Sequence, residues 1–154
     1  MTEIDTLVIA CGNRLRGDDG VAHAAAEMLI AWQLPGVRVL IVHQLTPELI
    51  EEVKQAECVL FIDAAIDTGE AAFQVRPIKP KKSRLLFGHH ESPGNLLALL
   101  QHLDDRCPQA WLLSIRALSF EYGDELTRDA KRDVNEAMAW LHGFLTEQSC
   151  TKSA

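Results

Sequence analysis

The sequence predicts an α/β fold in which helices cover a mostly parallel sheet. The first observation is the length of 154 residues, which suits one domain of ordinary size. The second is the alternation of short apolar runs with segments of helical periodicity, which is typical of layered α/β domains. The third is that the runs at 6–11 and 58–65 are continuously apolar, as in strands buried on both faces of a parallel sheet.

The first part of the chain contains two strand-helix units. Residues 6–11 predict the first strand, which ends at a glycine. The alanine-rich segment 20–34 is apolar at helical spacing, and the Pro-Gly pair directly after it predicts the end of the helix. The β-branched stretch 37–45 predicts a second strand. Thr46 has the character of an N-cap followed by proline, so we expect a helix over 47–56.

The rest of the chain supplies three more strands and two more helices. These are expected in the order β-β-α-β-α, at 58–65, 71–78, 94–106, 111–118 and 127–146. The stretch 71–78 alternates between apolar and polar residues, which favours an edge or antiparallel strand. Ser92 and the proline after it repeat the cap-plus-proline signal before the next helix. We therefore expect one domain at 1–148 with a disordered tail at 149–154.

Composition and charge exclude several classes of partner. The net charge of −7 disfavours nucleic acid or an anionic membrane, because both select a basic face. Five cations within 76–84 are interpreted as a solvated loop. The N-terminus has no signal-peptide pattern, and no apolar run approaches the ~18 residues of a membrane span. The four cysteines form no CxxC pair, so we expect a cytoplasmic protein with reduced thiols.

Three groups of polar residues follow predicted strands, where ligands bind in folds of this kind. They are Asn13, Asp18 and Asp19 after the first strand, Asp63 and Asp67 at the end of the third, and His89, His90 and Glu91 before the helix that begins near Ser92. Because the carboxyl ends of parallel strands share one edge of a sheet, we expect these groups to face one another.

Adjacent aspartates, Asp18 and Asp19, stand at the start of the second element. Carboxylates there would repel phosphate, and the loop lacks both the GxGxxG and the GK[ST] patterns, so a nucleotide-binding loop is disfavoured. Aspartate is a common N-cap, so we expect Asp18 to cap the helix. A second carboxylate is not needed for capping, so we expect Asp19 to face the crevice.

Two carboxylates and an imidazole with open positions would suit a divalent transition metal. Asp63 follows an apolar strand, where an unpartnered carboxylate is costly; it is either held by loop N–H groups or acts as a ligand or general base. His89 or His90 would supply the imidazole. His23, four residues after Asp19, is the reserve ligand.

Other residues near strand ends receive structural interpretations. Asp67 is interpreted as an ordinary turn residue. Cys11 is expected to be a small buried side chain, since no flanking signature marks it as a nucleophile. His43, His102 and His142 have no acidic cluster beside them in the sequence and are also interpreted as structural.

At this point the residues resemble a known family, the [NiFe]-hydrogenase maturation endopeptidases. The segments that carry the resemblance are GNRLRGDDG at 12–20, HQLTPELIEEV at 43–53, FIDAA at 61–65, HHESPGNLLALL at 89–100 and SIRALSFEYGDELT at 114–127. They cover nearly the whole chain in the family's order. Within the first segment, Gly12 and Asn13 are expected to position the substrate.

The resemblance implies a fold and an activity. The fold would be a three-layer α/β/α sandwich with a twisted five-stranded sheet, of the phosphorylase/hydrolase-like kind. The activity would be that of an aspartyl-type endopeptidase, which removes a C-terminal peptide from the hydrogenase large-subunit precursor after nickel insertion. The nickel would arrive with the substrate. Carried over by position, it would be recognised by Asp19, Asp63 and His89, with Asp19 and Asp63 as the catalytic pair. His90 is the alternative to His89, and Asp18 and His23 are further possible alternates.

The sequence also departs from the family pattern. Gly88 stands in place of a hydroxyl residue, 116–118 replaces a glutamine-proline segment, and Ala22 replaces a glycine. These departures bear on substrate details. Two other functions stay open: a non-enzymatic metal-sensing module or chaperone for the large subunit, and a phosphate-binding domain.

Overall fold

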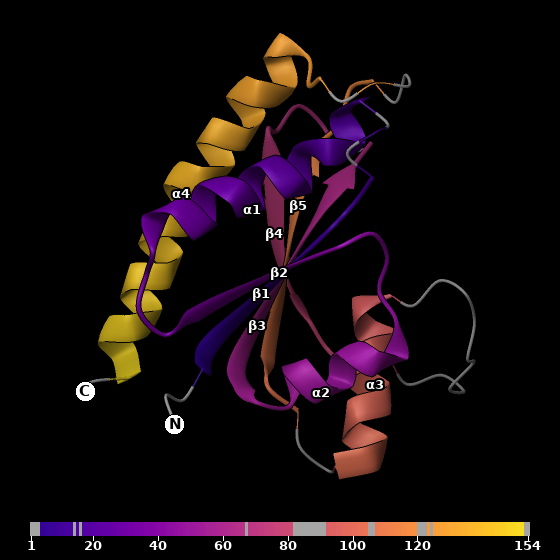
Figure 1. Ribbon diagram of the computed structural model, residues 1–154, viewed down its shortest axis with the longest axis vertical. Coiled ribbons are helices and arrows are strands. Elements are labelled where there is room, and N and C mark those ends of the chain that lie inside the picture. Colours follow the sequence, from indigo (N-terminus) through magenta and orange to yellow (C-terminus); the bar gives the residue numbers. More distant parts are fainter. Residues whose placement is uncertain are drawn as a thin grey trace.

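The computed structural model has a five-stranded sheet between two layers of helices, which confirms the predicted fold (Figure 1). It describes residues 4–13, 15, 17–66, 68–81, 92–104, 107–119, 123 and 125–152. The strand order is β2-β1-β3-β5-β4. Within the described residues, α1 and α4 cover one face of the sheet and α2 and α3 cover the other.

Four of the strands are parallel and one is antiparallel. Their bounds are β1 Ile4–Cys11, β2 Val37–Val42, β3 Ala56–Ala65, β4 Phe73–Ile78 and β5 Gln109–Arg116. β4 pairs antiparallel with β5 at one edge of the sheet. The alternating pattern at 71–78 had predicted such a strand, and Pro77 fits there because proline is confined to edge strands or bulges.

The helices differ from expectation mainly in length. Their bounds are η1 Gly17–Gly20, α1 Val21–Trp32, η2 Pro47–Leu49, α2 Ile50–Val53, α3 Pro93–Asp104 and α4 Arg128–Lys152. The helix expected over 47–56 is only a 3-10 turn and one α-turn, because the chain re-enters the sheet at Ala56. α4 passes the expected end at Thr146 and includes the first residues of the segment expected to be a tail.

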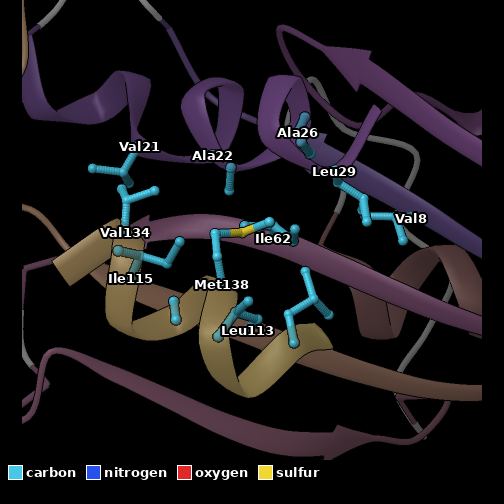
Figure 2. Close-up of a cluster of buried hydrophobic side chains, with 14 of the residues drawn as sticks. Val8, Val21, Ala22, Ala26, Leu29, Ile62, Leu113, Ile115, Val134 and Met138 are labelled. Atoms are coloured by element: carbon cyan, nitrogen blue, oxygen red, sulfur yellow. The ribbon is translucent and has the colours of Figure 1, made fainter. Parts of the chain in front are cut away.

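Alternating residues of the strands build two separate cores. Val8, Ile62 and Leu113 face α1 and α4, whereas their neighbours in sequence face α2 and α3. Figure 2 shows Val21 of α1 and Met138 of α4 in the first core, near Ile62 of β3. Burial on both faces explains why the central strands are continuously apolar.

The strand order places a switch point at β1. The chain runs from β1 outward to β2 and then returns to β3 on the other side of β1. In open α/β sheets, ligands bind outside the carboxyl ends of strands at such a point. No helix among the described residues is long and apolar enough to cross a membrane.

Candidate functional site

A cavity of about 520 Å³ lies at the carboxyl ends of β1, β2 and β3, where the switch point predicts a site. Its walls include the ends of these strands, the glycine loop after β1 and the start of α3. Asp19 and Asp63 both line it. The structure therefore brings together the two carboxylates that the sequence singled out, from segments more than forty residues apart.

The glycine loop holds Asp19 through close backbone contacts. A Cβ atom on Gly12 would lie 2.4 Å from the carbonyl oxygen of Asp19, so only glycine fits there. The N–H of Asn13 donates to Oδ2 of Asp19 at 2.8 Å. The side-chain Oδ1 of Asn13 accepts from the N–H of Leu15 at 3.0 Å, which folds the loop into a tight turn. Gly12 and Asn13 thus shape the loop that presents Asp19.

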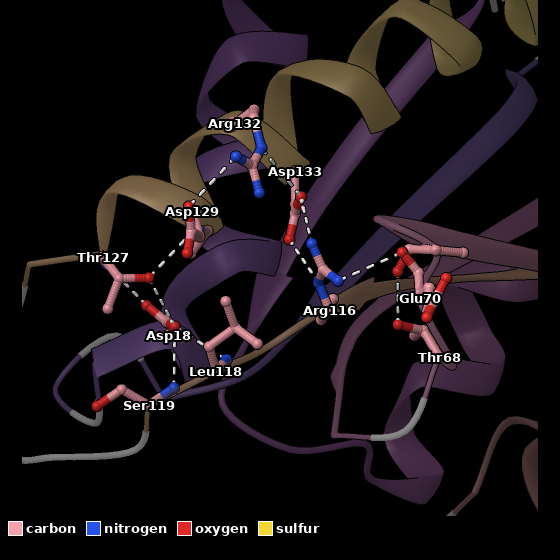
Figure 3. Close-up of polar contacts among 12 residues, drawn as sticks. Asp18, Thr68, Glu70, Arg116, Leu118, Ser119, Thr127, Asp129, Arg132 and Asp133 are labelled. Carbon is pink, nitrogen blue, oxygen red and sulfur yellow. Dashed lines mark hydrogen bonds and ion pairs between the residues drawn. The ribbon is translucent and has the colours of Figure 1, made fainter.

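Asp18 has a different task from the one expected. The N-cap of α1 is Gly20, with no side-chain cap, so Asp18 does not cap α1. Its carboxylate is fully buried and accepts the backbone N–H groups of Leu118, Ser119 and Thr127, each at 2.9 Å, and the Thr127 hydroxyl at 3.0 Å (Figure 3). The prediction failed because the partners lie 100 and more residues away in the sequence.

Asp63 is a carboxylate with an unmet hydrogen-bonding need. Its Oδ1 atom is buried and has no hydrogen-bond partner among the described residues. Burial raises the pKa of Asp63 to about 6, and the Asp19 charge raises it too, while a hydrogen bond from Ser114 and the charge of Arg76 oppose the shift. Buried polar atoms are nearly always paired, so the free oxygen marks a place for a ligand, metal or water.

Two further residues at this cavity received structural interpretations from the sequence. Cys11 ends β1 and lines the cavity, half-buried, with its thiol 3.6 Å from the carbonyl oxygen of His43. Burial and the charges of Asp63 and Asp19 raise the pKa of Cys11, so the thiol is protonated near neutral pH. His43 follows β2 and also lines the cavity. Both lie at strand ends, the signal that had identified the other clusters.

The remaining candidates lie elsewhere or outside the described residues. His23 is occupied, because its Nε2 lies 2.7 Å from the carbonyl oxygen of Gly12. Asp67, His89 and His90 fall outside the described residues. Ser92, three residues after His89, caps α3 by accepting the N–H of Asn95 at 3.1 Å, and it lines the cavity.

The donor set at the cavity fits part of a metal site. Oxygen donors from Asp19 and Asp63 are present, and one Asp63 oxygen is buried without a partner. Among the described residues, no three His, Cys, Asp or Glu side chains are close enough to hold a metal ion by themselves. Two carboxylates would therefore need further ligands, from a segment outside the described residues or from a bound substrate.

The chain is an α/β domain in which two carboxylates line a cavity at the switch point. Its fold is similar to that of solved hydrogenase maturation endopeptidases. The sequence identities between this chain and those structures are low, so the similarity establishes the fold and nothing further. No protein-family model matches the sequence, and no curated protein gives a significant match.

Three of the similar structures illustrate the match. The hydrogenase maturating endopeptidase HybD from E. coli superposes with a TM-score of 0.74 at 18% identity, covering 93% of both chains. The [NiFe] hydrogenase maturation protease HycI from Thermococcus kodakarensis KOD1 gives a TM-score of 0.74 at 17% identity, also over 93% of both chains. HybD from Thermococcus kodakarensis gives 0.69 at 23% identity, over 91% of this chain and 98% of its own.

Proposed function

We propose that this protein is a hydrogenase maturation endopeptidase. It would remove a C-terminal peptide from the large-subunit precursor of a [NiFe] hydrogenase after nickel has been inserted. The proposal rests on the fold shared along nearly the whole chain with proteins described by that activity. We further propose that it acts in the cytoplasm, where precursors of this kind would be assembled.

The observation that carries the proposal is the convergence of Asp19 and Asp63 on one cavity. A glycine loop presents the first carboxylate, and the end of β3 presents the second. Fold alone does not determine function, so the site must support the activity independently. Two carboxylates at a cavity of about 520 Å³ give room for a peptide segment with a bound metal.

Nickel in this proposal belongs to the substrate. Bound in the precursor, it would supply a Lewis acid, and the precursor would supply the metal ligands that the two carboxylates alone do not provide. Asp19 and Asp63 would engage the loaded precursor, with His89 as the third recognition group. Unloaded precursor would lack this anchor, so recognition would serve as a checkpoint.

The same groups can support hydrolysis of a peptide bond. Docking would place the scissile carbonyl beside Asp63 and a water molecule within its reach. Asp63, with a pKa of about 6, is mostly ionised at neutral pH and suited to accept a proton from that water as it attacks. The proton would then pass to the amine that leaves with the C-terminal peptide.

The test is replacement of each carboxylate by its neutral amide. Asp19→Asn and Asp63→Asn each keep an oxygen for the hydrogen bond that the aspartate accepts, so the fold is expected to persist. Processing of nickel-loaded precursor should fall roughly 100-fold or more. Mass spectrometry of the precursor measures loss of the C-terminal peptide.

Asp129→Asn is the matched control, since Asp129 is exposed on α4 and is not among the residues that line the cavity. Its processing rate should equal that of the wild type. Retained processing in both site variants would contradict the assignment. A wild-type protein that binds the precursor stably without shortening it would favour the non-enzymatic binding module instead.

A further inference from the structure

A second cavity adjoins the proposed active site on the side of β4. It measures about 290 Å³ and shares Asp63 and Leu112 with the first cavity. Its remaining walls are the side chains of Ser114, Gln74 and Arg76 and the short residue Ala65. Asp63 thus stands between two hollows, one toward β1 and one toward β4.

The register of the sheet explains how this second cavity is built. Asp63 of β3 pairs with Ser114 of β5, and Ser114 pairs with Gln74 of β4. Directly paired residues point to the same face of a sheet, so these three form a polar row across three strands. Arg76 lies two residues after Gln74 and therefore on that face as well. The row runs at right angles to the strands and leads away from the Asp19 cavity.

Arg76 is the residue of this row that is available to bind a ligand. Ser114 is engaged with Asp63, and the amide nitrogen of Gln74 donates to the carbonyl oxygen of Thr68 at 3.2 Å. The guanidinium of Arg76 forms no hydrogen bond or close ion pair with another described residue, although its charge lowers the pKa of Asp63. It is the single cation among the described residues that line this cavity.

Charge separates the two ends of the row. β3 and β4 are two strand spacings apart, roughly 10 Å, so the Asp63 end is acidic and the β4 end is basic. An anion at the β4 end would contact Arg76, whose charge acts on Asp63 across the same cavity. A guanidinium with free donors is suited to bind a carboxylate through two parallel hydrogen bonds.

We infer that the second cavity is a subsite for the precursor's C-terminal segment and that Arg76 there binds a carboxylate of that segment. The inference rests on the proposed function and adds a specificity-determining residue to it. A chain whose scissile bond lies beside Asp63 would continue along the polar row toward β4. The carboxylate would be an acidic side chain near the cut or the chain terminus itself.

Steady-state processing of nickel-loaded precursor by Arg76→Ala and Arg76→Lys tests the subsite. Arg76→Ala should raise KM roughly 10- to 100-fold, as expected for loss of a charged hydrogen-bonded contact, with kcat changed far less. The KM of Arg76→Lys should lie between those of the wild type and Arg76→Ala, because lysine keeps the charge but cannot form two parallel hydrogen bonds. Arg38→Ala, on the opposite edge strand β2, is the control and should leave KM unchanged.

Two sets of precursor variants identify the source of the carboxylate. In one, acidic residues near the cut become their amides one at a time; in the other, two added glycines displace the terminal carboxylate. The change that raises KM for the wild type, but not for Arg76→Ala, identifies the bound group.

Equal KM values for the wild type and Arg76→Ala would overturn the subsite while leaving the proposed function intact. So would a raised KM that couples to none of the precursor changes. Failure of the wild type to cleave any precursor would contradict the proposed function, and the subsite with it.

Discussion

Adjacent aspartates in one short loop have separate structural tasks. Asp18 is buried and accepts four hydrogen bonds from residues that follow β5 or directly precede α4. Asp19 lines the cavity and accepts one hydrogen bond from Asn13. Each side chain is held by a different part of the molecule. The loop can therefore anchor itself through one carboxylate and present the other.

This division predicts a stability defect without a defect in chemistry. In the wild type, the Asp18 carboxylate accepts hydrogen bonds from N–H and O–H donors. In Asp18→Asn, the amide NH₂ group would face some of these donors and could not accept from them. Unfolding in urea should show a loss of about 2–4 kcal/mol, typical of buried charged hydrogen bonds left unmade. The fraction of Asp18→Asn that remains folded should keep the Asp63 carboxylate in its place at the cavity. Asp129→Asn is again the control, and an unchanged midpoint for Asp18→Asn would contradict the role assigned to Asp18.

For single residues, sequence patterns predicted which side chains lie at the cavity better than they predicted hydrogen-bond partners. Asp19 and Asp63 could be located because both stand beside strand ends, a purely local property. The partners of Asp18 could not, because Leu118 and Thr127 become its neighbours only through the sheet topology. Cys11 and His43 also line the cavity. They received structural interpretations because no flanking signature marks Cys11 as a nucleophile and no acidic cluster stands beside His43 in the sequence.

Among the elements, the strands were predicted more accurately than the short helices. The sequence predicted all five described strands in order. Burial on two faces leaves a continuous apolar signal in the central strands, and the alternating pattern at 71–78 indicated the edge strand β4. The segment 47–56 shows the limit, because the cap and the proline predict where a helix begins but not how soon the chain must return to β3. The length of the helix at 47–56 is set by packing against the rest of the fold, which local sequence does not specify.

Arg116, at the end of β5, has a structural role at a position where the sequence departs from the family that it resembles. Arg116 donates from Nε and Nη2 to the two oxygens of buried Asp133 on α4, at 2.9 and 3.2 Å, and from Nη1 to the Glu70 carbonyl oxygen at 3.3 Å (Figure 3). The arginine thus joins β5, α4 and the turn before β4. Its role is to hold these elements together behind the site.

The junction between β1 and α1 depends on the absence of a side chain at Gly12. Gly12→Ala would place Cβ 2.4 Å from the Asp19 carbonyl oxygen, so the backbone of η1 would have to shift. We expect a destabilisation of about 1–3 kcal/mol and a loss of processing, because Asp19 moves with that backbone.

Gly143→Ala in α4 is the matched control. It meets no atom within 4 Å and should stabilise the protein by about 0.5–1 kcal/mol, since alanine favours helix. Thermal unfolding and precursor processing measured on both variants separate the two effects. A Gly12→Ala protein with wild-type processing would show that the loop tolerates the shift.

For the whole molecule, the buried carboxylate at the site predicts a pH-dependent stability. The pKa of Asp63 is raised from 3.8 to about 6, so between these values the folded state binds more protons than the unfolded state. The contribution of Asp63 to the free energy of unfolding therefore falls as pH rises through this window and stays low above it. The full cost is of the order of 3 kcal/mol.

Removing this titration should stabilise the fold at neutral pH. Asp63→Asn is expected to gain up to about 3 kcal/mol over the wild type at pH 7.5, and the gain should shrink toward zero by about pH 4. Urea unfolding at several pH values measures the difference. A gain independent of pH would contradict the raised pKa, and Asp129→Asn should show no such trend.

The anchoring of Asp18 also bears on how the protein comes into being. The loop after β1 is synthesised early, but three of its hydrogen-bond donors are 100 or more residues downstream. While Leu118, Ser119 and Thr127 are still inside the ribosomal exit tunnel, the Asp18 carboxylate lacks the donors that anchor it in the folded protein. The loop after β1 is therefore expected to reach its folded form only after the residues between β5 and α4 have left the ribosome.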